Sequence, residues 1–252
     1  MSQFSLKNKI ALVTGASRGI GEKIAMLLSE NGGHVILVSR KQEGLEQVAE
    51  KIRHKGRDVT VMACHMGHIG QIQTLMKKVK EQFGRLDILV NNAAANPYFG
   101  DMLNAEEWAW DKTNNVNLKG PFFMTKEAVK LMAKAGGGSV VNISSINAVR
   151  PALMQGIYSI TKAGLIAMTQ AFAKELAPMG VRVNAVLPGL TDTKFSSALT
   201  ANEDIKNMVL QQIPMGRMAA PGEIAGAVLY LVSDAASYTT GSCITCDGGM
   251  LA

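Results

Sequence analysis

Tyr158 and Lys162, four residues apart, are the side chains of this sequence whose spacing best suits proton transfer. They open a stretch with apolar residues at helical spacing, so the two side chains are expected one turn apart on one helix face. An ammonium group beside a phenol favours the phenolate, which is expected to lower the pKa of Tyr158 from about 10. The pair indicates a proton donor to an alkoxide, although the same spacing also occurs by chance on ordinary helix surfaces.

A glycine-rich segment from Thr14 to Gly21 has the spacing TGxxxGxG and stands between an expected strand and an expected helix. Glycines at such a junction let the backbone approach a pyrophosphate at the helix N-terminus. A tight turn without a ligand is the alternative, because the spacing differs from GxGxxG. The position between strand and helix favours dinucleotide binding.

The end of the expected second strand bears on the choice of cofactor. A carboxylate there would bind the ribose 2′-hydroxyl of NAD, whereas a basic residue accommodates the 2′-phosphate of NADP. This strand ends in Ser39 and Arg40, and Arg18 of the glycine-rich segment could lie on the other side of a phosphate. NADP(H) is therefore expected, with two solvated arginines as the alternative.

Short β-branched runs alternate with amphipathic helical patterns along the whole chain. Strands are expected at residues 10–13, 34–38, 59–63, 88–91, 139–143, 181–186 and 243–245. This alternation predicts an α/β protein in which residues 1–252 form a single-domain Rossmann fold, a seven-stranded parallel sheet with helices on both faces. It weakens at residues 190–218, a stretch too long for an ordinary connection, and we expect a substrate lid there.

Three further motifs follow in a fixed order. Asn91-Asn92-Ala93-Ala94 comes after the fourth strand, Ser145 lies thirteen residues before Tyr158, and Pro188-Gly189 follows the sixth strand. Together with the glycine-rich segment and the Tyr158 pair, they resemble the short-chain dehydrogenase/reductase family over essentially the whole chain. The stretch from Asn96 to Gly100 is similar to the NADP-dependent carbonyl/retinal reductase branch of that family.

The resemblance implies a role for each motif residue. Tyr158 would be the acid/base, Lys162 its partner and a ligand of the nicotinamide ribose, and Ser145 a hydrogen-bond partner of the substrate carbonyl. Asn117 would hold a water of the proton relay to Lys162. The family often has an aspartate after the third strand that contacts adenine, but this chain has His65, so a backbone contact is expected there. The implied cofactor-binding residues are Gly15, Ser17, Arg18, Gly19, Ile20, Gly21, Ser39, Arg40, His65, Asn92, Ala93, Tyr158, Lys162, Pro188, Gly189, Thr191 and Thr193.

The loops after the catalytic strands are mostly apolar, which favours an apolar ketone or a dicarbonyl over a sugar. The expected substrate-binding residues are Tyr98, Phe99, Ser145, Met154, Tyr158 and Phe195. The expected function is NADP(H)-dependent interconversion of a carbonyl and a secondary alcohol. A 3-oxoacyl-carrier-protein reductase shares every motif and is the alternative enzyme. A catalytically idle NADP(H)-binding sensor is the alternative of another class, which the intact catalytic set disfavours.

Composition excludes several other classes. The chain has 26 basic and 20 acidic residues with no run of like charge, so no nucleic-acid partner is expected. No apolar run approaches the roughly 18 residues of a membrane span, and an odd number of cysteines argues against a disulfide framework. We expect a cytoplasmic location and no metal site. The resemblance implies a homotetramer, with Met168, Phe172 and Leu176 or the segment from Cys243 to Ala252 as candidate subunit surface.

Overall fold

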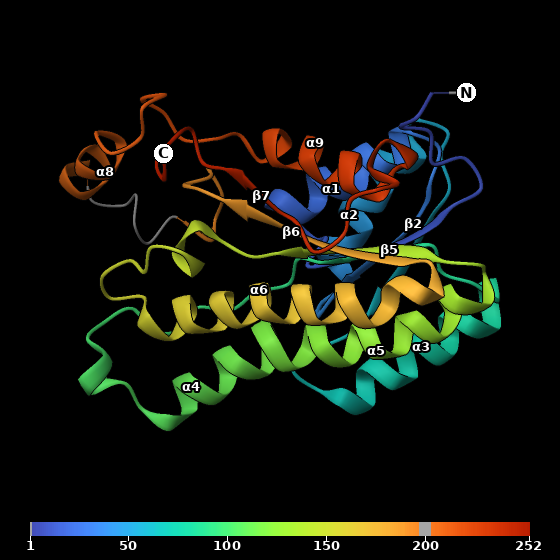
Figure 1. The fold of residues 1–252 in the computed structure, drawn as a ribbon, viewed down its shortest axis with the longest axis horizontal. Helices are drawn as coiled ribbons and strands as arrows, with labels where there is room; N and C mark the ends of the chain where they lie inside the picture. The colour runs from blue at the N-terminus through green and yellow to red at the C-terminus, as the bar shows by residue number, and fades with distance from the viewer. Residues whose placement is uncertain (1, 197–202) are drawn as a thin grey trace.

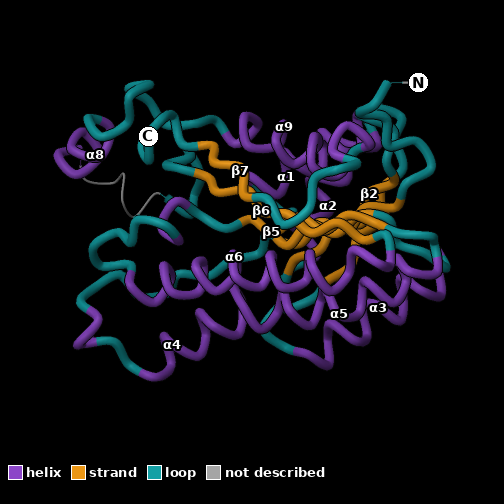
Figure 2. Tube along the Cα trace, viewed as in Figure 1, coloured by secondary structure: helices purple, strands orange, loops and turns teal. Residues whose placement is uncertain are grey.

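The computed structural model describes residues 2–196 and 203–252. All seven expected strands form, and each ends within two residues of its expected boundaries. They form one sheet of parallel strands in the order β3-β2-β1-β4-β5-β6-β7 (Figures 1 and 2). The strands are β1 (Ile10–Thr14), β2 (His34–Ser39), β3 (Val59–Ala63), β4 (Ile88–Asn91), β5 (Gly138–Ile143), β6 (Val181–Pro188) and β7 (Cys243–Cys246).

Helices cover both faces of the sheet, which confirms the single-domain Rossmann architecture (Figure 1). One face carries α1 (Gly19–Glu30), α2 (Gln42–Arg53) and α9 (Pro221–Val232). The other carries α3 (Ile69–Phe83), α4 (Glu107–Asn114), α5 (Gly120–Lys134) and α6 (Gly156–Leu176). A π-helical turn, η2 (Asn115–Lys119), joins α4 to α5, and the short 3-10 helices are η1 (Met102–Asn104), η3 (Ile146–Ala148), η4 (Ala177–Met179) and η5 (Asp234–Ala236).

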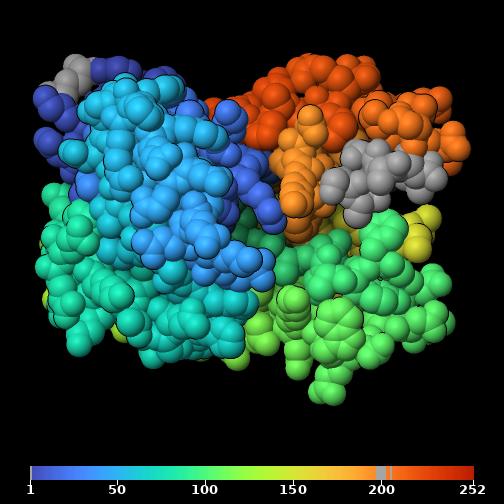
Figure 3. All heavy atoms as spheres, turned by 180° about the vertical axis from the view of Figure 1, so that it is seen from behind, coloured from blue at the N-terminus to red at the C-terminus, as the bar shows by residue number. Residues whose placement is uncertain are grey.

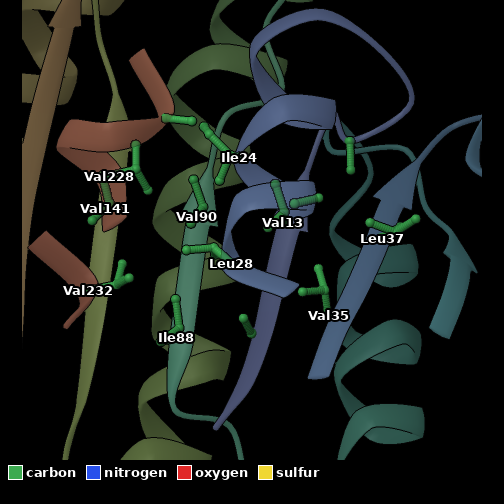
Figure 4. Close-up of a cluster of buried hydrophobic side chains, with 14 of the residues drawn as sticks. Val13, Ile24, Leu28, Val35, Leu37, Ile88, Val90, Val141, Val228 and Val232 are labelled. Carbon is green, nitrogen blue, oxygen red and sulfur yellow. The ribbon is translucent and has the colours of Figure 1, made fainter. Parts of the chain in front are cut away.

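The core consists of two apolar layers, one on each face of the sheet. In the first, Ile24 and Leu28 of α1 pack against Val13 and Val90 of the central strands (Figure 4). Because both faces are covered, residues 11–13 of β1 are all fully buried rather than alternately exposed. This packing holds the carboxyl ends of the central strands rigidly at one edge of the sheet.

The strand order reverses between β1 and β4, since β1 pairs with β2 on one side and with β4 on the other. Connections from neighbouring strands leave in opposite directions at such a point and open a crevice at the carboxyl ends. The fold therefore predicts the place of the ligand site before any side chain is considered.

The described parts of the expected lid, residues 190–196 and 203–218, follow β6 and contain α8 (Glu203–Leu210). In Figure 1 this helix lies beyond the end of the sheet, near the C-terminus. Residues 197–202 of the expected lid lie outside the described residues. No helix in the described part of the chain is long and apolar enough to cross a membrane.

The expectation for the subunit-contact surface is partly wrong. Met168 and Leu176 are buried within the chain, because α6 directs these side chains toward the sheet. Ile160 of the same helix and Phe122 of α5 are exposed instead. Of the cysteines, Cys243 on the edge strand β7 is exposed, whereas Cys64 is buried.

Candidate active site

A cavity of about 1300 Å³ opens at the carboxyl ends of the strands. Its walls come from the glycine-rich segment, the end of β2, the segments after β4 and β5, the start of α6 and the segment after β6. Figure 3 shows the recess where the blue N-terminal part, the green segment after β4 and the orange segment after β6 meet. One cavity thus joins the expected cofactor motifs to the expected catalytic residues.

The glycines of the segment between β1 and α1 are required by close packing. Gly15 has a left-handed φ of +67°, and a Cβ there would lie 2.7 Å from Nδ2 of Asn92. A Cβ at Gly21 would overlap the carbonyl oxygen of Gly15 and the same Asn92 nitrogen. Any larger residue would push the segment out of the position in which its backbone faces the cavity.

Thr14 is a site residue for which the sequence analysis assigned no role. Its hydroxyl accepts hydrogen bonds from the backbone N–H groups of Asn92 (2.9 Å) and Ala93 (3.0 Å) and donates to the carbonyl of Val90 (3.2 Å). The side chain of Asn92 donates in return to the carbonyls of Thr14 (2.9 Å) and Gly15 (3.2 Å). These bonds fix the ends of β1 and β4 relative to each other. The feature of the sequence that could have indicated this role is the position of the threonine directly before the first glycine of the motif.

All residues expected to bind the cofactor line this cavity, from Gly15 at one end to Lys162 at the other. The lining is strongly basic. Of the described residues that line it, Asp192 is the one carboxylate, whereas the basic residues are Arg18, Lys23, Arg40, Lys112, Arg150, Lys162 and Lys194. Arg18 and Arg40 are solvent-exposed, and no carboxylate stands at the end of β2. The donor set fits an anionic dinucleotide.

The backbone of His65, which was expected to contact the adenine, has hydrogen-bond partners within the protein. Its N–H donates to Oε1 of Gln71 (2.8 Å), and its carbonyl accepts from the N–H of His68 (2.9 Å). Its ring nitrogen Nδ1 accepts from the N–H of Gly67 (3.0 Å). Burial, the neighbouring His68 and the positive charge of Arg40 lower the pKa of His65, so the ring is neutral at physiological pH. His65 lines the cavity, and its contact with the cofactor stays a prediction.

Ser145, Tyr158 and Lys162 meet at the deep end of the cavity. Tyr158 (8% exposed) and Lys162 (2% exposed) lie on the first turns of α6, and Lys162 Nζ lies 5.4 Å from the centroid of the Tyr158 ring. Burial raises the pKa of Tyr158 to about 12, and a hydrogen bond with Ser145 acts in the opposite direction. The Ser145 hydroxyl oxygen also accepts from the N–H of Asn147 (3.1 Å), which fixes its position at the end of β5.

The expectation that Lys162 lowers the pKa of Tyr158 is wrong. Burial lowers the pKa of Lys162 itself to about 7, so its charge is reduced at neutral pH. Lys162 Nζ donates to the carbonyl of Ile143 (2.7 Å), and the Ser144 hydroxyl donates to the carbonyl of Lys162 (2.8 Å). These two bonds attach α6 to the end of β5 and hold the lysine toward the cavity.

The Asn117 side chain is hydrogen-bonded within the protein, and the expected role of Asn117 in holding a relay water stays a prediction. The side chain is fully buried and lies outside the described lining of the cavity. Its Oδ1 accepts from the N–H of Ala95 (2.7 Å), and its Nδ2 donates to the carbonyl of Ala95 (2.9 Å) and to Thr161 (3.2 Å). Asn117 therefore positions the segment after β4 against α6. It does so from a π-helical turn, a local distortion that is frequent near functional sites.

The substrate side of the cavity contains most of the expected residues. The Phe195 ring centroid lies 5.7 Å from that of Tyr158, and Phe99 and Met154 line the same wall. Met154 has a left-handed φ of +62°, which is uncommon for a residue with a side chain. Tyr98 is the exception, because it lies outside the described lining and its hydroxyl donates to the carbonyl of Asp101 (2.7 Å) within its own loop.

Comparisons with known proteins extend over nearly the whole chain. A family model described as enoyl-(acyl carrier protein) reductase matches residues 15–251. Dehydrogenase/reductase SDR family member 4 of Homo sapiens is 40% identical over 244 residues, which cover 97% of this chain and 88% of that protein.

Solved structures agree with the fold. A short-chain type dehydrogenase/reductase from Mycobacterium marinum has a TM-score of 0.93 at 33% identity and covers 98% of this chain and 97% of its own. A gluconate 5-dehydrogenase from Burkholderia cenocepacia J2315 was solved in complex with NADP and tartrate. It has a TM-score of 0.95 at 26% identity, and the match covers 99% of this chain and 97% of that chain. With these matches and the motifs in their expected order, the chain belongs to the short-chain dehydrogenase/reductase family of oxidoreductases.

Proposed function

We propose that this protein is an NADP(H)-dependent reductase that interconverts a carbonyl and a secondary alcohol. The observation that carries the proposal is the single cavity that has the glycine-rich segment at one end and Ser145, Tyr158 and Lys162 at the other. A carbonyl group between these ends would meet a hydride donor on one side and a proton donor on the other. That arrangement is what carbonyl reduction requires.

The residues act on the oxygen of the substrate. Ser145, held by the Asn147 N–H, hydrogen-bonds the carbonyl oxygen. Tyr158 is protonated at neutral pH because its pKa is raised to about 12, and it gives its proton to the oxygen as negative charge develops there. Lys162, with a pKa near 7, can exchange a proton at physiological pH and lies close enough to stabilise the resulting phenolate.

The cofactor preference is supported by charge. Arg18 and Arg40 line the cavity near the end of β2, where a carboxylate would favour NAD. The related gluconate 5-dehydrogenase was solved with NADP. The glycine-rich segment and these arginines would hold the pyrophosphate and the 2′-phosphate, and the reduced nicotinamide would supply the hydride.

Apolar ketones or dicarbonyls are the proposed substrates, because Phe99, Met154 and Phe195 form much of the wall near Tyr158. An acyl thioester carried by an acidic protein is a second candidate. It is favoured by the description of the matching family model and by the exposed Arg150, which lines the cavity. We also propose that residues 190–218 form a lid and that the protein is a homotetramer, which the exposed Phe122 and Ile160 support.

The test is a turnover assay at the absorbance of reduced nicotinamide. Wild type and Tyr158→Phe are compared with NADPH and NADH on apolar ketones, dicarbonyls, polyols and acyl thioesters. We expect wild type to reduce hydrophobic carbonyls with NADPH, and Tyr158→Phe to bind NADPH normally while losing turnover, because only its hydroxyl supplies the proton. Near-normal kcat in Tyr158→Phe would overturn the mechanism, and the highest kcat/KM on acyl thioesters would favour the second candidate.

A further inference from the structure

A cluster of three amide side chains stands beside the catalytic residues on the otherwise apolar substrate side. Asn96 comes from the segment after β4, Asn147 from η3 after β5, and Gln155 from the residue that precedes α6. All three line the cavity, and Gln155 is buried. Amides brought together from three segments contrast with an apolar wall that would suit a simple ketone.

The orientation of Gln155 follows from its hydrogen bonds. Its Oε1 accepts from Nδ2 of Asn96 and from Nδ2 of Asn147, both at 3.4 Å. With the oxygen held on that side, Nε2 points the other way. In the described part of the chain this nitrogen has no hydrogen bond, and it is not among the buried atoms without a partner, so it is open to the cavity that the residue lines. An amide donor is thus held in a fixed direction.

The Gln155 amide is linked to the catalytic residues. Gln155 precedes Tyr158 by three residues at the N-cap position of α6, and both residues line the cavity. Asn147 connects the two groups, because its side chain donates to Gln155 while its backbone N–H donates to Ser145. Asn147 thus links the Gln155 amide to the Ser145 hydroxyl that would hold the substrate oxygen.

We propose, on the basis of the proposed function, that Gln155 is a substrate-positioning residue whose Nε2 donates to a second oxygen on the carbon next to the reacting carbonyl. The enzyme then prefers α-dicarbonyl and α-hydroxycarbonyl compounds over the corresponding monoketones. Asn96 and Asn147 set the direction of the donor, and the apolar wall of Phe99 and Phe195 receives the remainder of the molecule.

The test compares 1-phenyl-1,2-propanedione with propiophenone, which has the same carbon skeleton without the second oxygen. Steady-state kinetics with NADPH are measured for wild type, Gln155→Leu and Gln155→Glu. Leucine removes both functions of the amide, whereas glutamate keeps the acceptor for Asn96 and Asn147 and removes the donor. Gln73→Leu makes the same change at an exposed position of α3, outside the described lining and outside the proposed lid, and serves as the matched control.

We expect both Gln155 variants to lower kcat/KM for the diketone by about tenfold, mainly through KM, and to change propiophenone by less than about twofold. The control should keep the wild-type ratio. An equal loss on both substrates, no loss on either, or a Gln155→Glu enzyme with the wild-type ratio would overturn the proposal, since each indicates a structural role or none. If the wild type reduces neither compound nor any other carbonyl, the proposed function itself fails.

Discussion

Replacing Lys162 with methionine should remove a pH dependence of folding stability that burial of this amine creates. Lys162 is 2% exposed, and burial lowers its pKa from 10.5 to about 7. Between those two values the unfolded chain holds a proton that the folded chain has released, so the free energy of unfolding rises with pH. The contribution of Tyr158 has the opposite sign, but it begins only above pH 10, because burial raises its pKa to about 12.

The magnitude follows from the size of the pKa change. Each pKa unit corresponds to about 1.36 kcal/mol, so the penalty for burying the charged amine is on the order of 4 kcal/mol at pH 7. The penalty declines to roughly 2 kcal/mol at pH 9, because the pH then approaches the pKa of the Lys162 amine in the unfolded chain. Wild type should therefore gain about 2 kcal/mol relative to Lys162→Met between pH 7 and pH 9. Methionine is suited to the comparison because it is unbranched, apolar and adaptable in packing.

The assay is urea unfolding of both proteins without cofactor, followed by circular dichroism at pH 7, 8 and 9 and at one protein concentration. Titratable groups that both proteins share, such as Cys243 and Cys246, whose pKa burial raises, cancel in the difference between the two proteins. The lost hydrogen bond to Ile143 shifts the difference by a constant amount, independent of pH. A difference that stays the same from pH 7 to pH 9 would refute the reasoning, because Lys162 would then titrate outside the window.

Three further predictions concern the cofactor end of the cavity and the assembly. Arg40→Ala should raise KM for NADPH about tenfold with little change for NADH, through loss of a charge-assisted hydrogen bond; a wild type that prefers NADH contradicts it. Gly21→Ala should abolish NADPH binding and lower Tm, since its Cβ would overlap Gly15 and Asn92. The control is Gly226→Ala in the middle of α9, where an added Cβ has nothing within 4 Å and should stabilise the fold by about 0.5–1 kcal/mol. Normal NADPH binding by Gly21→Ala would contradict the packing argument. Light scattering should give about four times the 26.9 kDa chain mass, and a monomeric mass at micromolar concentration counts against the tetramer.

The fold could be predicted from sequence because its signals are local. Each strand is a short β-branched run, and the parallel sheet follows from the alternation of these runs with helices. The glycine-rich segment and the Tyr158 pair are also local, since their spacing alone defines a strand-to-helix turn and one helix face. The residues expected at the cofactor therefore line one cavity, although they come from segments as distant as Gly15 and Thr193.

Properties that depend on contacts between distant segments were decided only by the tertiary structure. The spacing of Tyr158 and Lys162 indicates a charged lysine acting on a phenol, but burial by the surrounding elements reverses the expected pKa change. The side-chain amide of Asn117 bonds to Ala95 and Thr161, which lie 22 and 44 positions away in the chain. The direction of Gln155 likewise depends on Asn96, 59 residues earlier in the chain. Sequence patterns report periodicity and local spacing, whereas desolvation and hydrogen-bond partners are set by which segments the fold brings together.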